Sequence, residues 1–241
     1  MRMAMARVPS RQIYGMHHLI EQAYNGVHDW LDSDPDMCRY RSLSEADASK
    51  ALGRDTPVLA AFNFNYYFPT HYFKACHALQ SDDIIGLDRL GAWLRYNPYL
   101  AIIDVGCGDG AGSVAGIETV LRLRECGQID PRPVHMFCLG IDRNEKGLWI
   151  YEKMMEEIAK NVADSGVLLQ YAVCPYPVYQ ASGYAENRLA ELRKSVWAQP
   201  ALSHSITVIG NLTDILHNDY MVDRRRLSGA ARQLRTFGMV H

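Results

Sequence analysis

A cluster of glycines, Asp104-Val-Gly-Cys-Gly-Asp-Gly-Ala-Gly112, overlaps the end of the apolar run 100–105 and precedes a helical pattern over 113–126. A short apolar run that ends in glycines predicts a buried strand followed by a tight turn. Glycine has no Cβ, so a ligand can approach the backbone of such a turn closely. We expect free amide N–H groups at the start of the helix, where they favour an anionic group of the ligand.

From Tyr99 onward, strand patterns and helix patterns alternate. Further strands are predicted over 135–141, 167–173 and 205–209, and helices over 146–163, 184–197 and 223–235. Four strand–helix units in series predict a parallel sheet with right-handed crossovers. The predicted fold class is therefore α/β, with a Rossmann-like, mostly parallel sheet and flanking helices.

Residues 1–98 have a different texture, helical and rich in aromatic side chains. Helices are predicted over 70–80, after Pro69, and over 87–96, before Asn97-Pro98. Ser44 and Asp47 have the spacing of a capping box, in which Asp47 would reach back to the backbone of Ser44. We therefore predict an N-terminal helical and aromatic cap over 1–98 and a Rossmann-like domain over 99–241.

Asp142 ends the second predicted strand, at the sheet edge where the glycine turn is also expected. A carboxylate there can accept hydrogen bonds from both hydroxyls of a ribose. Two cofactors fit this arrangement, because Gly106, Gly108 and Ala111 also satisfy the Gly-x-Gly-x-x-Ala pattern of nicotinamide dinucleotide sites. The residues alone leave both cofactors open.

The string DVGCGDG resembles motif I of the class I S-adenosylmethionine-dependent methyltransferases, in which an acidic residue, here Asp104, precedes the glycines by two positions. The resemblance extends to Gly-Ile-Asp142, with Asp142 as the ribose-binding acid. It implies that Gly106, Gly108 and Gly110 line the methionine end of S-adenosylmethionine and that Asp104 orients its amino group, directly or through water. It also implies methyl transfer to an RNA or small-molecule acceptor.

An aromatic segment over 63–72 precedes motif I, and Tyr67-Phe-Pro-Thr-His-Tyr72 resembles a segment of the Rsm22-like ribosomal methyltransferases, whose cysteine cluster is absent here. As a lid over the acceptor, Tyr66, Tyr67 and Tyr72 would stack on a flat substrate. The alternative for the same side chains is core packing of the N-terminal helices.

Two residues are candidates for a catalytic role. Asn211 follows the fourth predicted strand, where the resemblance places the fourth motif of the superfamily and a side chain that faces the transferable methyl group. His71 can serve as a general base where the acceptor must lose a proton, and His217 is a further candidate. A loop residue that caps a turn is the alternative for Asn211.

A full sheet of this superfamily has seven strands, and only 236–241 follows the last predicted helix. The resemblance therefore leads us to expect a sheet that lacks its last strands. Because exposed sheet edges are usually covered, we also expect a second copy of the chain or a partner subunit at the fourth strand.

Charge and cysteine content bear on the binding partners and the cellular compartment of the protein. A formal net charge of −2 gives no global attraction to nucleic acid, although arginines in the last predicted helix offer a local basic face for RNA phosphates. No apolar run is long enough to span a bilayer. The six cysteines have neither paired nor zinc-finger spacing, which predicts free thiols, no metal site and a reducing compartment. We expect the cytoplasm, and the basic residues Arg2, Arg7 and Arg11 make the mitochondrion the alternative.

Two other functions fit the same fold. An NAD(P)-dependent oxidoreductase would bind its cofactor at the glycine turn. However, no Tyr-Lys or His-acid pair that could catalyse its reaction can be placed in the sequence. A non-catalytic binding or scaffold protein could keep the fold without turnover.

Overall fold

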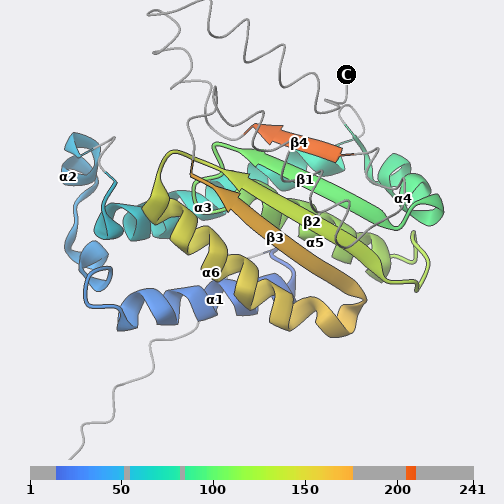
Figure 1. The fold of residues 1–241 in the computed structure, drawn as a ribbon, viewed down its shortest axis with the longest axis horizontal. Coiled ribbons are helices and arrows are strands. Elements are labelled where there is room, and N and C mark those ends of the chain that lie inside the picture. The colour runs from blue at the N-terminus through green and yellow to red at the C-terminus, as the bar shows by residue number, and fades with distance from the viewer. Residues whose placement is uncertain (1–14, 52–54, 82–84, 176–204, 210–241) are drawn as a thin grey trace, which may run out of the picture.

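The computed structural model describes residues 15–51, 55–81, 85–175 and 205–209 (Figure 1). Four helices precede the sheet, with a 3-10 turn at Cys38–Ser42 between the first two: α1 (His18–Ser33), α2 (Glu45–Lys50), α3 (Pro57–Gln80) and α4 (Leu87–Tyr96). The strands are β1 (Tyr99–Val105), β2 (Val134–Ile141), β3 (Val167–Cys174) and β4 (Ser205–Ile209). The helices between them are α5 (Ala111–Glu125) and α6 (Glu145–Val162), the latter followed by a 3-10 turn at Ala163–Ser165.

The four strands form one parallel sheet in the order β3-β2-β1-β4. From β1 the chain first moves through α5 and α6 toward β3, and β4 lies on the other side of β1. The strand order therefore reverses at β1, and ligands of open α/β sheets bind outside the carboxyl ends of the strands at such a point. The predicted α/β, Rossmann-like parallel sheet is confirmed, and α4 and β4 have the predicted bounds.

The helices α5 and α6 pack against the sheet through apolar side chains and close backbone contacts. Gly116 in α5 lies against β1, where a Cβ would come within 2.9 Å of Ile102 Cδ1, so this glycine permits a close approach of helix to strand. The apolar residues that recur at helical spacing along α6 are all buried: Leu148, Ile150, Tyr151, Met154, Met155 and Ile158. Burial of this stripe fixes the side of α6 that faces the core.

The N-terminal helices form an outer layer on α5 and α6, with α3 against α5 and α1 against α6 (Figure 1). The apolar side chains of α1 and α3 belong to the same continuous core as those of the sheet and its helices. The N-terminal helical region predicted from the sequence is thus present, and it is packed on the helices that flank the glycine turn.

The helix α3 differs from its predicted bounds, because it runs through Pro69 from Pro57 to Gln80 instead of beginning after the proline. An interior proline costs about 3 kcal/mol of helix stability. Phe64, Phe68 and Tyr72 lie four residues apart, are fully buried, and pack in part on Tyr24 of α1. Burying each such ring contributes about 1.5–3 kcal/mol, so the aromatic stripe outweighs the proline.

The capping box at α2 is only partly as predicted. Asp47 N–H donates to Ser44 Oγ at 3.1 Å, as expected for the cap. The Asp47 carboxylate accepts from the Ser44 hydroxyl at 2.5 Å rather than from its backbone N–H, and this part of the prediction is wrong. Aspartate is one methylene shorter than the glutamate of a full capping box, which keeps its carboxylate from the backbone.

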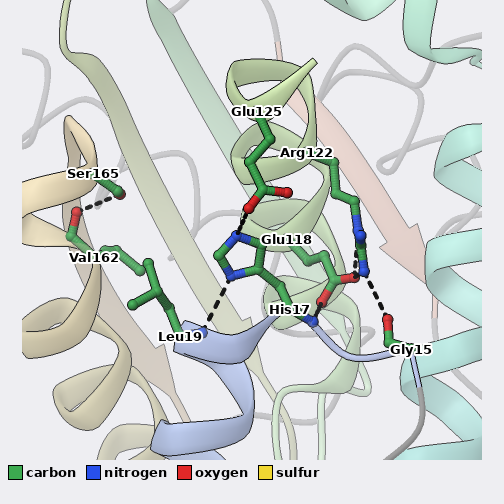
Figure 2. Close-up of polar contacts among 8 residues, drawn as sticks. All are labelled: Gly15, His17, Leu19, Glu118, Arg122, Glu125, Val162 and Ser165. Carbon is green, nitrogen blue, oxygen red and sulfur yellow. Dashed lines mark hydrogen bonds and ion pairs between the residues drawn. The ribbon is translucent and has the colours of Figure 1, made fainter. Parts of the chain in front are cut away.

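A partly buried polar network ties the start of α1 to α5 (Figure 2). His17 N–H donates to Glu118 Oε2 at 2.9 Å, and Arg122 both pairs with Glu118 and donates to Gly15 O at 2.7 Å. The His17 ring caps α1, because its Nδ1 accepts a hydrogen bond from the backbone N–H of Leu19, the second residue of the helix. These contacts fix where the N-terminal layer begins on the helix that follows the glycine turn.

His17→Ala is expected to lower the free energy of unfolding by about 1–2 kcal/mol, the usual cost of a lost N-cap. Burial lowers the pKa of His17, and the charge of Glu125 acts in the opposite direction. As the pH falls, the His17 side chain is protonated in the unfolded chain before it is protonated in the folded protein, because its pKa is lower in the folded protein. The contribution of His17 to stability is therefore present above the ordinary histidine pKa and is lost as the pH falls through the pKa of the folded state. Urea unfolding at pH 5.5 and 7.5 measures both effects.

The exposed His77 of α3 provides the control for that experiment, since His77→Ala removes the same type of side chain away from the cap. Equal losses of stability in the two variants, or an unchanged pH dependence in His17→Ala, would contradict the assignment of His17 as the cap.

The six cysteines are free thiols, as predicted. Four are buried, while Cys38 is half-buried and Cys126 exposed. Within the described ranges, the helices are all too short or too polar to cross a bilayer.

Candidate functional site

The loop between β1 and α5 has a backbone path that only glycine adopts readily. Gly106, Gly108 and Gly110 have φ values of +69°, +51° and +93°. The loop is pinned to the end of β2, because Gly106 N–H and Cys107 N–H both donate to Ile141 O, at 2.7 and 3.2 Å. Its glycines are therefore required by the conformation itself, and the loop lies at the carboxyl edge where the strand order reverses.

Asp142 lies in direct contact with this loop. Its Oδ2 accepts a hydrogen bond from Gly108 N–H at 2.8 Å, and its Oδ1 accepts one from Asn144 N–H at 2.8 Å. The structure thus brings together the glycine turn and the acid that the sequence placed at one edge. Each carboxylate oxygen can accept more than one hydrogen bond, so the hydroxyls of a ribose can still bind to Asp142.

Asp104 is buried at the end of β1 and acts as a cap for α5. Its Oδ2 accepts from Ser113 N–H at 2.7 Å and from the Ser113 hydroxyl at 3.1 Å. Burial raises the pKa of Asp104 to about 6, and the two hydrogen bonds from Ser113 act in the opposite direction. The positive end of the helix dipole is therefore already matched by a carboxylate of the protein.

The amide groups of the loop are largely occupied, which corrects the expectation of free N–H groups for an anionic ligand. Gly108 N–H is bound to Asp142, Ser113 N–H to Asp104, and Gly110 N–H to Cys107 O. Sequence spacing does not show this, because the two carboxylate acceptors come from two different strand ends. A phosphate would have to displace side chains that already satisfy these donors.

A third carboxyl group, Asp109, lies within the loop. Burial raises the pKa of Asp109 to about 7; its own N–H and that of Ala111 lower it, and the charges of Asp104 and Asp142 raise it further. Three acidic groups therefore share one small region, in which they repel one another. Such a region favours a cationic group in a ligand and disfavours an anionic one.

The predicted substrate-facing tyrosines occupy two different environments. Tyr66 and Tyr67 are 52% and 38% exposed on the outer side of α3, where Tyr66 stacks on Phe62 with ring centroids 4.3 Å apart. Tyr72 is fully buried, with its ring stacked on Phe68. The structure thus places Tyr72 in the core instead of on a surface that a substrate could reach, because it continues the buried stripe of α3.

The start of α3 lies near the edge that carries Asp142. The Asp55 carboxylate, two residues before α3, accepts from Glu145 N–H and Lys146 N–H, both at 3.0 Å, at the start of α6. Tyr66 follows about 13 Å further along the helix axis. His71 lies one turn beyond Tyr67, and burial lowers the pKa of His71, with the charge of Lys74 acting in the same direction.

Some of the predicted features lie outside the described residues. These are Asn211, His217, the helices predicted over 184–197 and 223–235, and the basic residues near both ends of the chain.

Three residues of the site were not singled out from the sequence: Ser113, Asp109 and Tyr151. Tyr151 belongs to the buried apolar stripe of α6, yet its hydroxyl lies 3.0 Å from Ser113 Oγ. Ser113 occupies the third helical position of α5, where a capping carboxylate binds, and this spacing is the signal that could have identified it.

The ligand atoms of His17, His18 and Glu125 lie within 4.8 Å of one another, an arrangement that resembles a metal centre. His17 Nδ1 accepts from Leu19 N–H, so the neutral ring carries its proton on Nε2, which lies 2.9 Å from Glu125 Oε1. A metal ion needs a ring nitrogen with a free lone pair, and neither nitrogen of His17 offers one. This cluster is therefore a hydrogen-bonded link between α1 and α5.

Comparison of the chain with models of protein families, with curated proteins and with solved structures gave no match.

Proposed function

We propose that this chain binds S-adenosylmethionine at the carboxyl ends of β1 and β2 and transfers its methyl group to an RNA or small-molecule acceptor. The contact between Gly108 and Asp142, at the point where the strand order reverses, supports this site. Asp142 would bind the ribose hydroxyls, the glycine loop would carry the methionine end, and Asp104 would orient the amino group.

The acidic character of the loop is the observation that carries the choice of cofactor. S-adenosylmethionine carries a sulfonium, an ammonium and one carboxylate, and so has a net positive charge, whereas a nicotinamide dinucleotide presents a pyrophosphate with two negative charges. Asp104, Asp109 and Asp142 lie at a loop whose amides at Gly108 and Ser113 are bound by carboxylates. Their charges attract the first ligand and repel the second, so we favour the methyl donor over NAD(P).

Methyl transfer needs no covalent catalysis by the protein, because the sulfonium is already a strong methyl donor. The protein has to align the acceptor atom, the methyl carbon and the sulfur, and to exclude water from them. The exposed rings of Tyr66 and Tyr67 offer a stacking surface for a flat acceptor such as a nucleobase. Asn211 and His71 stay candidates for a polar contact to the acceptor or for the removal of its proton.

Isothermal titration calorimetry with S-adenosylmethionine, S-adenosylhomocysteine and NAD tests the proposal. We expect saturable binding of the first two and none of NAD. Asp142→Ala removes a charged acceptor, worth about 1.5–3 kcal/mol per hydrogen bond, so affinity should fall at least tenfold. Asp164→Ala is the matched control, because Asp164 is an exposed carboxylate before β3, at the opposite edge of the sheet.

The same titrations between pH 5.5 and 8.5 test the charge argument. A bound cation stabilises the ionised carboxyls, so binding should release protons and affinity should rise as the pH passes the raised pKa values of Asp104, about 6, and Asp109, about 7. We expect S-adenosylmethionine to lose about tenfold in affinity at the acidic end and the uncharged thioether to lose less. Binding of NAD alone, or an unaffected Asp142→Ala variant, would end the proposal.

Transfer of a tritiated methyl group to total RNA or to cell extract then separates an enzyme from a binding protein. Incorporation that disappears in Asp142→Ala supports catalysis. Tight cofactor binding without any incorporation would instead assign the chain to non-catalytic relatives of the fold.

A further inference from the structure

Tyr151 of α6 occupies the space beneath the glycine loop. A Cβ on Gly110 would come within 2.6 Å of Tyr151 Cδ2, and a Cβ on Gly140 of β2 would come within 2.8 Å of Cε2 and Cζ. The ring therefore fills the volume left by two missing side chains, one in the loop and one in the neighbouring strand. Because the ring is fully buried, it can hold the loop against the end of β2.

The hydroxyl of Tyr151 continues this contact as a directional chain of hydrogen bonds. Tyr151 Oη lies 3.0 Å from Ser113 Oγ, and the Ser113 hydroxyl donates to Asp104 Oδ2 at 3.1 Å. A serine hydroxyl has one proton to donate, and it is used toward Asp104, so the tyrosine must be the donor to the serine. Hydrogen bonds in such a chain strengthen one another in a buried environment.

The chain of hydrogen bonds ends on the buried carboxylate of Asp104, which has few other sources of stabilisation. Among the described residues, the donors to Asp104 are the N–H and the hydroxyl of Ser113. The other titratable groups that act on this carboxyl are acids or thiols: Asp109, Asp142, Cys107 and Cys138. Those acids oppose its ionisation, so the relay from Tyr151 matters for keeping Asp104 an acceptor at neutral pH.

We propose that Tyr151 is a positioning residue of the cofactor site, which orients Ser113 and, through it, the Asp104 carboxylate toward the amino group of the methionine end. This inference rests on the proposed function, since that function supplies the cationic group that Asp104 would meet. Tyr151 does not touch the cofactor itself, and it acts through the serine and through the two glycines.

Tyr151→Phe tests the relay, because it keeps the ring and removes the hydroxyl. Titration of the Asp104 carboxyl carbon by NMR, assigned with Asp104→Asn, should show a pKa raised by about half a pH unit or more in Tyr151→Phe and in Ser113→Ala. The affinity for S-adenosylmethionine should fall about threefold or more at pH 6.5 and much less at pH 8.5. Tyr40→Phe is the matched control, since Tyr40 is buried and its hydroxyl donates to Asp32 in another part of the fold.

The two readouts separate this inference from the proposed function. An Asp104 carboxyl that titrates identically in wild type and Tyr151→Phe overturns the relay, whether or not any cofactor binds. A wild-type protein that fails to bind S-adenosylmethionine removes the proposed function, and with it the positioning role, even where the carboxyl titration shifts. Equal shifts in Tyr40→Phe would also overturn the relay, because the effect would then not be local.

Discussion

Gly110→Ala should lower the free energy of unfolding by about 2–5 kcal/mol, a large part of the 5–15 kcal/mol that keeps a typical domain folded. Gly110 caps α5 with φ +93° and ψ +17°, a left-handed conformation that costs an alanine about 1–2 kcal/mol. The new methyl group would also lie 2.6 Å from Tyr151 Cδ2. Overpacking of this kind costs about 1–3 kcal/mol, because a ring wedged between Gly110 and Gly140 has no room to move.

Urea unfolding followed by circular dichroism measures this loss, and Gly127→Ala is its control. Gly127 has φ +66°, and no described atom lies within 4 Å of the Cβ it would gain. The control should therefore lose only the left-handed cost, about 1 kcal/mol. Similar losses of stability in both variants would show that the Tyr151 ring moves aside for the new methyl group. That result would contradict the claim that the ring is held rigidly between Gly110 and Gly140.

The local signals of the site could be predicted from the sequence because each depends on neighbouring residues. An apolar run that ends in glycines specifies the strand and the turn by itself, and Asp142 needs only its place after the next strand. The parallel order then brings the turn and the acid together, as the contact between Gly108 and Asp142 shows. The bounds of α4 and β4 follow from equally local breaks in the pattern.

Features that depend on distant residues could not be predicted in this way. The proline rule fails at Pro69, because the stripe from Phe64 to Tyr72 gains more by packing on α1 than the helix loses. The many aromatic residues of this segment suggested one stacking surface. The four-residue spacing from Phe64 to Tyr72 instead places Tyr72 on the buried face of α3, and Tyr66, which does not share this spacing, is exposed. That spacing was visible in the sequence and was the better guide.

Electrostatics of the loop is the clearest case of information absent from local sequence. Glycines before a helix suggest free amides and an anionic ligand. Here the carboxylates of Asp104 and Asp142 reach those amides from two strand ends, 9 and 34 residues away from their donors Ser113 and Gly108. The preference of the loop changes from anion to cation only when these acceptors are in place, and this change is the physical basis for choosing the methyl donor.

Gly108→Ala should abolish most binding of S-adenosylmethionine while the fold persists. Gly108 has φ +51°, and no described atom lies within 4 Å of the Cβ that alanine would add, so the stability cost should be about 1 kcal/mol, as for Gly127→Ala. Gly108→Ala and Gly127→Ala should therefore lose similar amounts of stability, and they differ in whether the new methyl group lies in the proposed cofactor site. At position 108 the methyl group would enter the space in which we place the methionine end, beside the N–H that Asp142 holds.

We expect calorimetry to show a loss of about 100-fold or more in affinity for Gly108→Ala, equivalent to about 2.7 kcal/mol, and wild-type affinity for Gly127→Ala. Thermal unfolding of both variants, measured in parallel, verifies that their stabilities are alike. The reason for the difference is that a ligand in contact with the backbone has no room for a side chain there. Wild-type affinity in Gly108→Ala would mean that the cofactor does not lie against this face of the loop, and the proposed site at the ends of β1 and β2 would have to be abandoned.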